Sequence, residues 1–208
     1  MAIPRMMDEN TMIVPLIYRQ AVSQNNKMIS LFNRKGEKIS SFCEPEPHTD
    51  PIKANSINGI NVIPDRKGNI LAVFLALNRM DKYDRNGNLL YTMDRDSPVK
   101  EFIRKAGKNP EHGFTEWERS YITHSIQVDG RNRIWLVSFK KQPDEKKEYS
   151  TSDIPDILMF DVFDENGIHL CRIDFPEESF DQIRIIGDRM FFLDPREKGV
   201  VREYKING

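Results

Sequence analysis

Residues 65–74 read DRKGNILAVF, a short polar turn that leads directly into a run of apolar, strand-forming residues. The same pattern of a polar turn and an apolar run recurs at residues 129–137, which read DGRNRIWLV. Shorter copies read GDRMFFL at 187–193 and DENTMIV at 8–14. Asp, Asn and Gly supply the backbone angles of a tight turn, and the apolar residues after them favour a strand. Each copy therefore predicts a β-hairpin.

A second hairpin follows the first in three of these four units. Its turns read NRKG at 33–36, DRNG at 84–87 and DENG at 164–167. An Asn-Gly pair between apolar runs is the strongest hairpin signal that a short stretch of sequence carries. Two hairpins in a unit predict a four-stranded meander. The strands joined by these turns are expected at 28–32 and 38–42, at 80–83 and 89–93, and at 157–163 and 168–173.

The repetition of this unit decides the predicted fold. A single four-stranded sheet cannot bury both of its faces, so repeated sheets have to stack around an axis. We therefore predict an all-β fold, a β-propeller with about four blades in a single domain, 1–208. A β-sandwich is the alternative, but a sandwich does not need the same turn and strand to recur. The blades are expected at about 3–43, 59–94, 121–174 and 180–206.

The sequence motif of the repeat resembles that of a known family. The order Asp-x-x-Gly-Asn-Ile, a short strand, then Tyr-Asp-x-Asn-Gly-x-Leu-Leu is similar to that of bacterial six-bladed propellers of the NHL/TolB-like type. The resemblance covers about residues 3–206 and is strongest at 126–137 and 160–167. These motifs specify blade geometry, so the resemblance implies a fold and says little about a ligand.

The last unit departs from the pattern because it has only three expected strands, near 182–186, 190–193 and 200–206. In propellers of this type an N-terminal strand often completes the last blade, but residues 1–7 read as the innermost strand of the first unit. We therefore expect part of a six-bladed ring whose N-terminal blades are missing; a complete four-bladed ring is the alternative. Exposed strand edges in an open ring would favour self-association.

Three long connections interrupt the repeat. Residues 44–58 contain three prolines, and residues 140–156 form a charged, solvated excursion. Residues 94–120 are expected to be partly helical, with Ser97 as the N-cap, Pro98 in the first turn and Gly107 at the C-terminal end. Long loops on a rigid repeat scaffold often carry the function, so we expect a binding mouth where outer strands lead to the next inner strands.

The candidate binding residues follow from this expectation: His112 and Trp117 in the second connection, His124 at the start of an inner strand, and Asn61 and Arg184 on inner strands. They predict a non-catalytic module that binds a protein, a peptide or a small molecule. The alternative is a metal-dependent lyase or hydrolase at the propeller axis, but the sequence shows no catalytic signature, no metal-ligand spacing and no cofactor motif.

The composition excludes several other classes. Lys and Arg total 31 against 32 for Asp and Glu, without a basic stripe, so we expect no nucleic-acid binding. No apolar stretch reaches the 18 residues of a membrane span. Cys43 and Cys171 are expected to be isolated apolar residues near strand ends. No signal peptide is visible, and an extracytoplasmic location is expected only if such a signal is missing from this chain.

Overall fold

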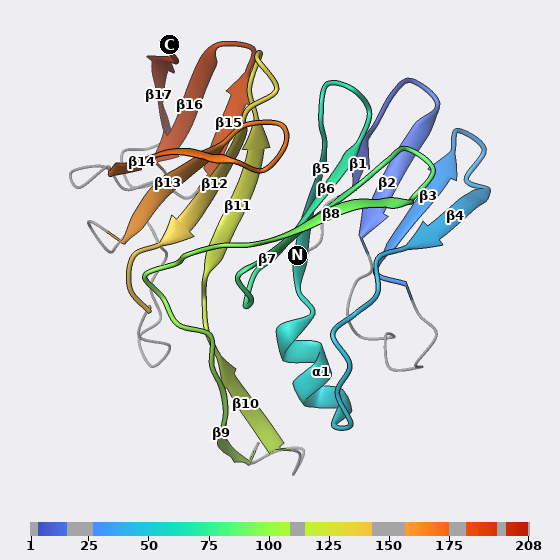
Figure 1. Cartoon of the computed structure of the whole chain (residues 1–208), viewed down its shortest axis with the longest axis vertical. Coiled ribbons are helices and arrows are strands. Elements are labelled where there is room, and N and C mark those ends of the chain that lie inside the picture. The colour runs from blue at the N-terminus through green and yellow to red at the C-terminus, as the bar shows by residue number, and fades with distance from the viewer. Residues whose placement is uncertain are drawn as a thin grey trace. The chain divides into compact units, whose positions relative to one another are not determined.

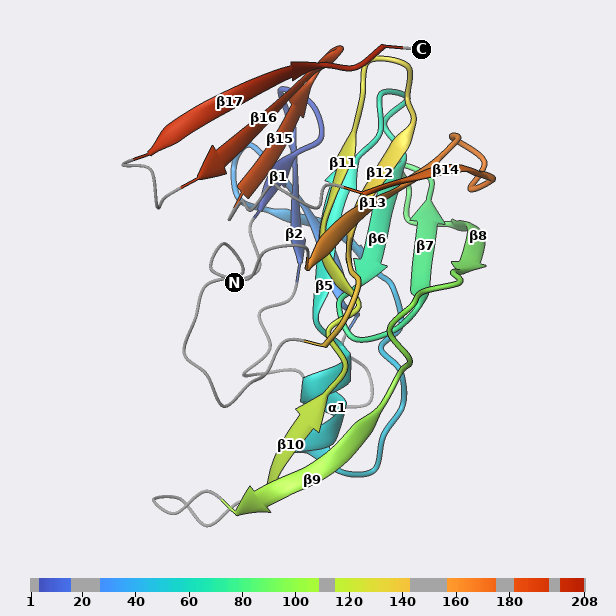
Figure 2. The same ribbon diagram turned by 90° about the vertical axis from the view of Figure 1, so that its left-hand side faces the viewer.

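A computed structural model describes residues 4–15, 27–108, 115–142, 157–174, 182–194 and 199–207. The chain divides into two compact units, and each is described by itself (Figures 1 and 2). The first unit comprises Met1–Asp96 and Lys100–Ile122, and the second comprises Ser97–Val99 and Thr123–Gly208. Among the described residues, no helix has the length and apolar character needed to cross a membrane.

The first unit contains two four-stranded antiparallel sheets in which the strands follow one another in chain order. The first sheet consists of β1 (Arg5–Met6), β2 (Thr11–Pro15), β3 (Ile29–Asn33) and β4 (Lys38–Phe42). The second consists of β5 (Ile60–Pro64), β6 (Ile70–Phe74), β7 (Arg79–Tyr83) and β8 (Leu89–Asp94). Strand β5 lies against β1 and β2, so the two meanders stack as neighbouring blades.

The second unit repeats this arrangement (Figure 2). Its first sheet consists of β11 (Thr123–Val128), β12 (Ile134–Phe139), β13 (Leu158–Phe163) and β14 (His169–Asp174). Its second sheet consists of β15 (Gln182–Ile186), β16 (Arg189–Asp194) and β17 (Val200–Lys205), with β15 against β11. In the described part of the chain this sheet has no fourth strand. The protein is an all-β β-propeller with four visible blades, and the predicted lack of an outer strand in the last blade is confirmed.

The turns after β3, β5, β7, β11 and β13 each close on an Asp or Asn side chain at the first turn position. The Asp65 carboxylate accepts hydrogen bonds from the backbone N–H groups of Lys67 and Asn69, both at 2.8 Å. Asn33, Asp84, Asp129 and Asp164 accept bonds from the same two relative positions, two and four residues later. These bonds satisfy two donors that the bent backbone leaves without a ladder partner.

The fourth position of these turns has a positive φ, between 65° and 88°. Glycine occupies it at Gly36, Gly68, Gly87 and Gly167, because a side chain disfavours this backbone conformation. In the two Asn-Gly pairs only the glycine has a positive φ. The hairpins predicted there are confirmed, but they close as three-residue loops with a left-handed last residue rather than as two-residue turns.

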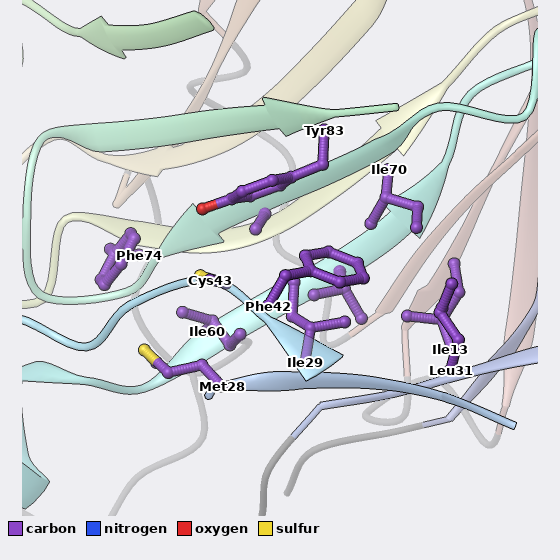
Figure 3. Packing of buried hydrophobic residues seen from close by; sticks show 12 residues of the cluster. Ile13, Met28, Ile29, Leu31, Phe42, Cys43, Ile60, Ile70, Phe74 and Tyr83 are labelled. Atoms are coloured by element: carbon purple, nitrogen blue, oxygen red, sulfur yellow. The ribbon is translucent and has the colours of Figure 1, made fainter. Parts of the chain in front are cut away.

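The buried residues of the first unit come from both blades (Figure 3). Ile13, Ile29 and Leu31 from the first blade and Ile60 and Ile70 from the second belong to one cluster. The rings of Phe42 and Tyr83 meet across the blade contact, with centroids 5.0 Å apart. Middle strands such as β6 and β13 are buried at every position, because each has neighbouring strands on both sides and packed faces.

The second long connection differs from its prediction. In place of a helix, it forms a two-stranded antiparallel ribbon of β9 (Ile103–Lys108) and β10 (Thr115–Arg119). The Ser97 hydroxyl accepts a bond from the Val99 N–H at 3.2 Å, so Ser97 caps a turn and no helix follows. The described helix, α1 (Pro51–Ile57), lies instead in the first connection, where no helix was predicted.

The two cysteines also differ from each other. Cys43 is buried directly after β4, as predicted, and it has a positive φ of 69°. Cys171 is exposed in the middle of β14, so the prediction of an apolar residue near a strand end is wrong there. An outer strand has solvent on one side, and therefore its residues need not be buried.

Two glycines with the same backbone angle test the contact between the first two blades. A Cβ at Gly87 would collide with the ring of Phe42, whereas a Cβ at Gly36 would meet no atom within 4 Å. We expect Gly36→Ala to cost about 1 kcal/mol of folding free energy, from the backbone conformation alone. Gly87→Ala should cost about 2–4 kcal/mol, because the overlap adds to that strain. Urea unfolding of both variants measures the difference, and equal losses would contradict the packing.

Acid stability tests the carboxylate of the third blade's first turn. Burial on its own would raise the pKa of Asp129, but the hydrogen bonds from Trp135 and Arg133 outweigh it and lower that pKa below 3.8. A lowered pKa in the folded state stabilises above pH ~4 and is lost as the pH falls through the folded value. We expect Asp129→Asn to lower the free energy of unfolding by about 1–3 kcal/mol at pH 7. Between pH 7 and pH 3, the free energy of unfolding of this variant should fall less than that of the wild-type chain.

Circular dichroism during urea unfolding between pH 7 and pH 3 provides the measurement. The control is Asp94→Asn, which removes an exposed carboxylate on β8. If Asp129→Asn keeps the acid dependence of the wild-type chain, another carboxylate governs it.

Candidate functional site

The predicted binding residues are divided between the two units. Asn61 on β5 and Trp117 on β10 are half-buried residues of the first unit. His124 on β11 and Arg184 on β15 belong to the second unit, where His124 is half-buried and Arg184 is exposed. His112 lies outside the described residues. A common site for these five residues therefore stays a prediction.

In the first unit the two inserted elements come together. Helix α1 lies in the connection from β4 to β5, and the ribbon of β9 and β10 follows β8 (Figures 1 and 2). The helix packs against β10. We call α1 and the ribbon together the platform. Its elements belong to the two connections where a binding mouth is expected from the sequence, and it contains Trp117.

Local hydrogen bonds explain why α1 forms where prolines are frequent. The Asp50 side chain caps the helix by accepting bonds from the N–H groups of Ile52 at 2.9 Å and Lys53 at 3.0 Å. At the other end, the buried Asn58 amide donates to the Ala54 carbonyl at 2.9 Å. It also binds both backbone groups of Glu46, at 2.7 and 3.0 Å. The helix is therefore fixed to the chain that leads into it.

An ion-pair network that ends on a buried carboxylate ties this segment to the second blade. The Glu46 carboxylate binds Arg79, whose guanidinium makes a bidentate contact with Asp81 at 2.9 and 2.7 Å. Asp81 is fully buried and also accepts bonds from Tyr83 and Thr92, each at 2.9 Å. The carboxylate of Asp81 raises the pKa of Arg79, so the guanidinium stays charged.

The ribbon is fixed to the same blade through β10. The Arg119 guanidinium donates to the Ser56 carbonyl of α1. The buried Ser120 hydroxyl donates to the Ala76 carbonyl at 2.8 Å, and the Ile122 N–H donates to the Leu75 carbonyl at 2.9 Å. These bonds join the platform to the loop between β6 and β7. A loop held at several points presents its side chains in a defined geometry, which is what a binding surface requires.

Trp117 lies at the centre of the platform. The Nζ atom of Lys53 is 5.3 Å from the centroid of its ring, a cation–π contact between helix and ribbon. The buried Nε1 of Trp117 and the buried Oδ1 of Asn55 have no hydrogen-bond partner among the described residues. A buried polar atom without a partner costs about 1–3 kcal/mol, so the platform would gain stability if a bound group satisfied these atoms.

No group of three His, Cys, Asp or Glu side chains in the described ranges could hold a metal ion. Burial raises the pKa of Cys43 to about 11, so its thiol is protonated near neutral pH and is a poor nucleophile. Burial also raises the pKa of Tyr83, next to Cys43.

Sequence reasoning did not identify the polar pairs that connect the third and fourth strands of each complete blade. These pairs are Ser30 with Ser41 at 2.8 Å, Asp81 with Thr92 at 2.9 Å, and Asp161 with Arg172 at 2.7 Å. All three occupy the same register between the strands. The available signal is Asp161 within the otherwise apolar strand β13, because a carboxylate needs a partner when it is buried.

The ion pair under the platform leads to a double-mutant test. Arg79→Met should cost about 3 kcal/mol, because it leaves the buried Asp81 carboxylate without its cation. The double variant Arg79→Met/Asp81→Leu should lose less than the two single variants combined. As a control, Arg189→Met breaks the exposed pair with Glu203 and should cost less than about 1 kcal/mol. Additive losses in urea unfolding would contradict the coupling.

Comparisons with known proteins agree with the fold. No protein-family model and no curated protein matches this chain. Among solved structures, it is similar to a member of the DUF4221 family from Bacteroides vulgatus, with a TM-score of 0.60 and 8% sequence identity, over 97% of this chain and 63% of that chain. The chain therefore spans less than two thirds of that protein.

Two further solved structures show weaker likenesses. BamB from Moraxella catarrhalis has a TM-score of 0.48 and 11% identity over 99% of this chain and 58% of that chain. A catalytically inactive virginiamycin B lyase from Staphylococcus aureus, with quinupristin, has a TM-score of 0.38 and 13% identity over 99% of this chain and 69% of that chain. At 8% sequence identity, the likeness to the DUF4221 structure concerns the fold alone.

Proposed function

We propose that this chain is a non-catalytic binding module on a β-propeller scaffold, and that the platform contacts a protein, peptide or small-molecule partner. The observation that carries the proposal is Trp117, held between α1 and the ribbon with its buried Nε1 free of a described partner. Tryptophan is enriched among the residues that dominate binding energy at interfaces. The platform is also an insertion on a rigid repeat scaffold, where binding residues are often found.

The proposal includes a larger ring. Four blades that cover 63% of the similar DUF4221 chain correspond to about six blades in the whole of that chain, since 4 divided by 0.63 is about 6. This ratio supports a six-bladed ring, with residues 1–208 as part of one domain. The proposal that the ring is of the NHL/TolB-like type and bacterial in origin is based on the resemblance of the repeat motifs. Asn61 on β5 of the first unit, and His124 on β11 and Arg184 on β15 of the second unit, stay candidate binding residues in this proposal, and His112 lies outside the described residues.

Self-association is a second form of binding that the last blade favours. Ile186 on β15 is 68% exposed and Val201 on β17 is 59% exposed. Exposed apolar residues on a sheet without its outer strand favour pairing with another chain. No described cluster of ligands favours the metal-dependent lyase or hydrolase.

Affinity capture with the purified full chain tests the proposal. The wild-type bait should retain a partner that Trp117→Ala loses, with the affinity of the purified pair lowered at least about tenfold. The matched control is Leu89→Ala, which removes an exposed apolar side chain of β8 outside the platform. Circular dichroism should show both variants folded. If the Trp117→Ala bait retains every partner at the wild-type level, the platform is not the binding surface.

A further inference from the structure

Strand β9 is an exposed edge with a concentration of positive charge. It pairs with β10 on one side, and in the described part of the chain no strand pairs with its other side. Residues 104–108 are all exposed. The strand reads IRKAGK, with three cations and no anion. Its backbone donors and acceptors along the free side are thus surrounded by positive charge.

The positive charge on β9 exceeds that on the outer strands of the complete blades and on β17, where Glu203 accompanies Arg202 and Lys205. The outer strands of the three complete blades carry far fewer cations: β4 has Lys38, β8 has none and β14 has Arg172. The whole sequence has 31 basic against 32 acidic residues. The three cations in six residues of β9 therefore form a local excess.

Only part of this charge is neutralised within the platform. The Arg104 guanidinium binds the Glu118 carboxylate at 2.6 Å. Glu101, which precedes the strand, accepts a bond from the Asn78 N–H of the second blade and so is engaged there. Lys105 and Lys108 have no ion-pair partner among the described residues.

The cross-strand register places these lysines around the tryptophan. Lys105 is opposite Trp117, and Lys108 is opposite Thr115 at the end of the ribbon. Lys53 of α1 lies over the Trp117 ring. Cross-strand partners share a face of the ribbon, and Thr115 and Trp117 are two residues apart on β10, so the bulge in β9 places Lys105 and Lys108 on the same face. A ligand along β9 would therefore meet a free backbone edge with positive charge on that face.

We propose that the free edge of β9 binds an extended acidic segment of a protein partner, which adds to the ribbon as a third strand. The backbone edge supplies affinity through ladder hydrogen bonds, and Lys105 and Lys108 select carboxylates on the added strand. The inference rests on the proposed function and specifies the partner class of the same platform. A protein segment fits better than nucleic acid, because binding along a phosphate backbone commonly uses six to ten cationic contacts, which is roughly twice the number available here.

Isothermal titration of the full chain with short peptides tests this inference. The probe is a blocked peptide of four Val-Glu repeats, compared with its Val-Gln counterpart and with a Val-Glu peptide that has a central proline. We expect the Val-Glu peptide to bind at least about tenfold more tightly than either control, because Gln lacks the charge and proline interrupts the strand. Hydrogen exchange at residues 103–108 should slow on binding.

Variants of the chain complete the test. Lys105→Ala/Lys108→Ala should weaken the Val-Glu peptide about tenfold and reduce the salt dependence, whereas Lys38→Ala, on the exposed outer strand β4, should not. Equal binding of the proline peptide would overturn strand addition. Tighter binding of a single-stranded oligonucleotide, or of vesicles with anionic lipid, would overturn the choice of an acidic protein segment.

Two outcomes separate this inference from the proposed function. If no peptide binds and the double lysine variant self-associates, the lysines only protect an exposed edge, and the inference is wrong. The platform remains a binding surface in that case if Trp117→Ala still loses a captured partner. If the peptide binds to β9 but capture does not depend on Trp117, the proposed function fails instead.

Discussion

The architecture depends on the hydrogen bonds that one side-chain oxygen, from an Asp or Asn, accepts at the start of the capped blade turns. This oxygen binds the two backbone N–H groups that lie two and four residues later, and this fixes the direction in which the next strand leaves. The left-handed residue that follows determines the register of the hairpin. Because the same geometry recurs in three blades, consecutive meanders have similar shapes and can stack. At Asn132 the left-handed position is filled without glycine, and its amide binds Glu165 in the neighbouring turn at 3.0 Å.

A second constraint operates inside the blades and reaches the platform. Asp81 pairs two strands of its blade through Thr92 and holds Arg79, which in turn binds Glu46 before α1. A buried carboxylate is costly unless cations and donors surround it. The platform therefore has a defined position, because Glu46, which precedes α1, binds the arginine that neutralises the buried Asp81 carboxylate. Loss of that charge pair would disturb the blade and the platform together.

The sequence predicted the parts of the molecule that depend on neighbouring residues. The turns of the meanders and the bounds of β4, β6 and β15 were correct, since a hairpin needs only its own turn and flanks. Most of β9 was predicted as the end of a helix over 97–107, because Ser97 and Pro98 are local helix-start signals. The strands of the ribbon instead form through contacts with α1, such as the bond from Arg119 to Ser56, which join residues far apart in sequence. Lys53 and Arg79 were missed for the same reason.

The cost of ordering the ribbon links its structure to its role. Most of β9 is exposed, so the strand contributes little apolar burial to offset the conformational entropy lost when it is ordered, about 1–2 kcal/mol per residue. Hydrogen bonds at the base of β10 hold the ribbon at one end, but they add nothing to the free edge of β9. Strand β9 is ordered at the expense of stability, and the Trp117 N–H beside it has no partner among the described residues. Both features agree with the proposal that another molecule completes the stabilising contacts of the platform.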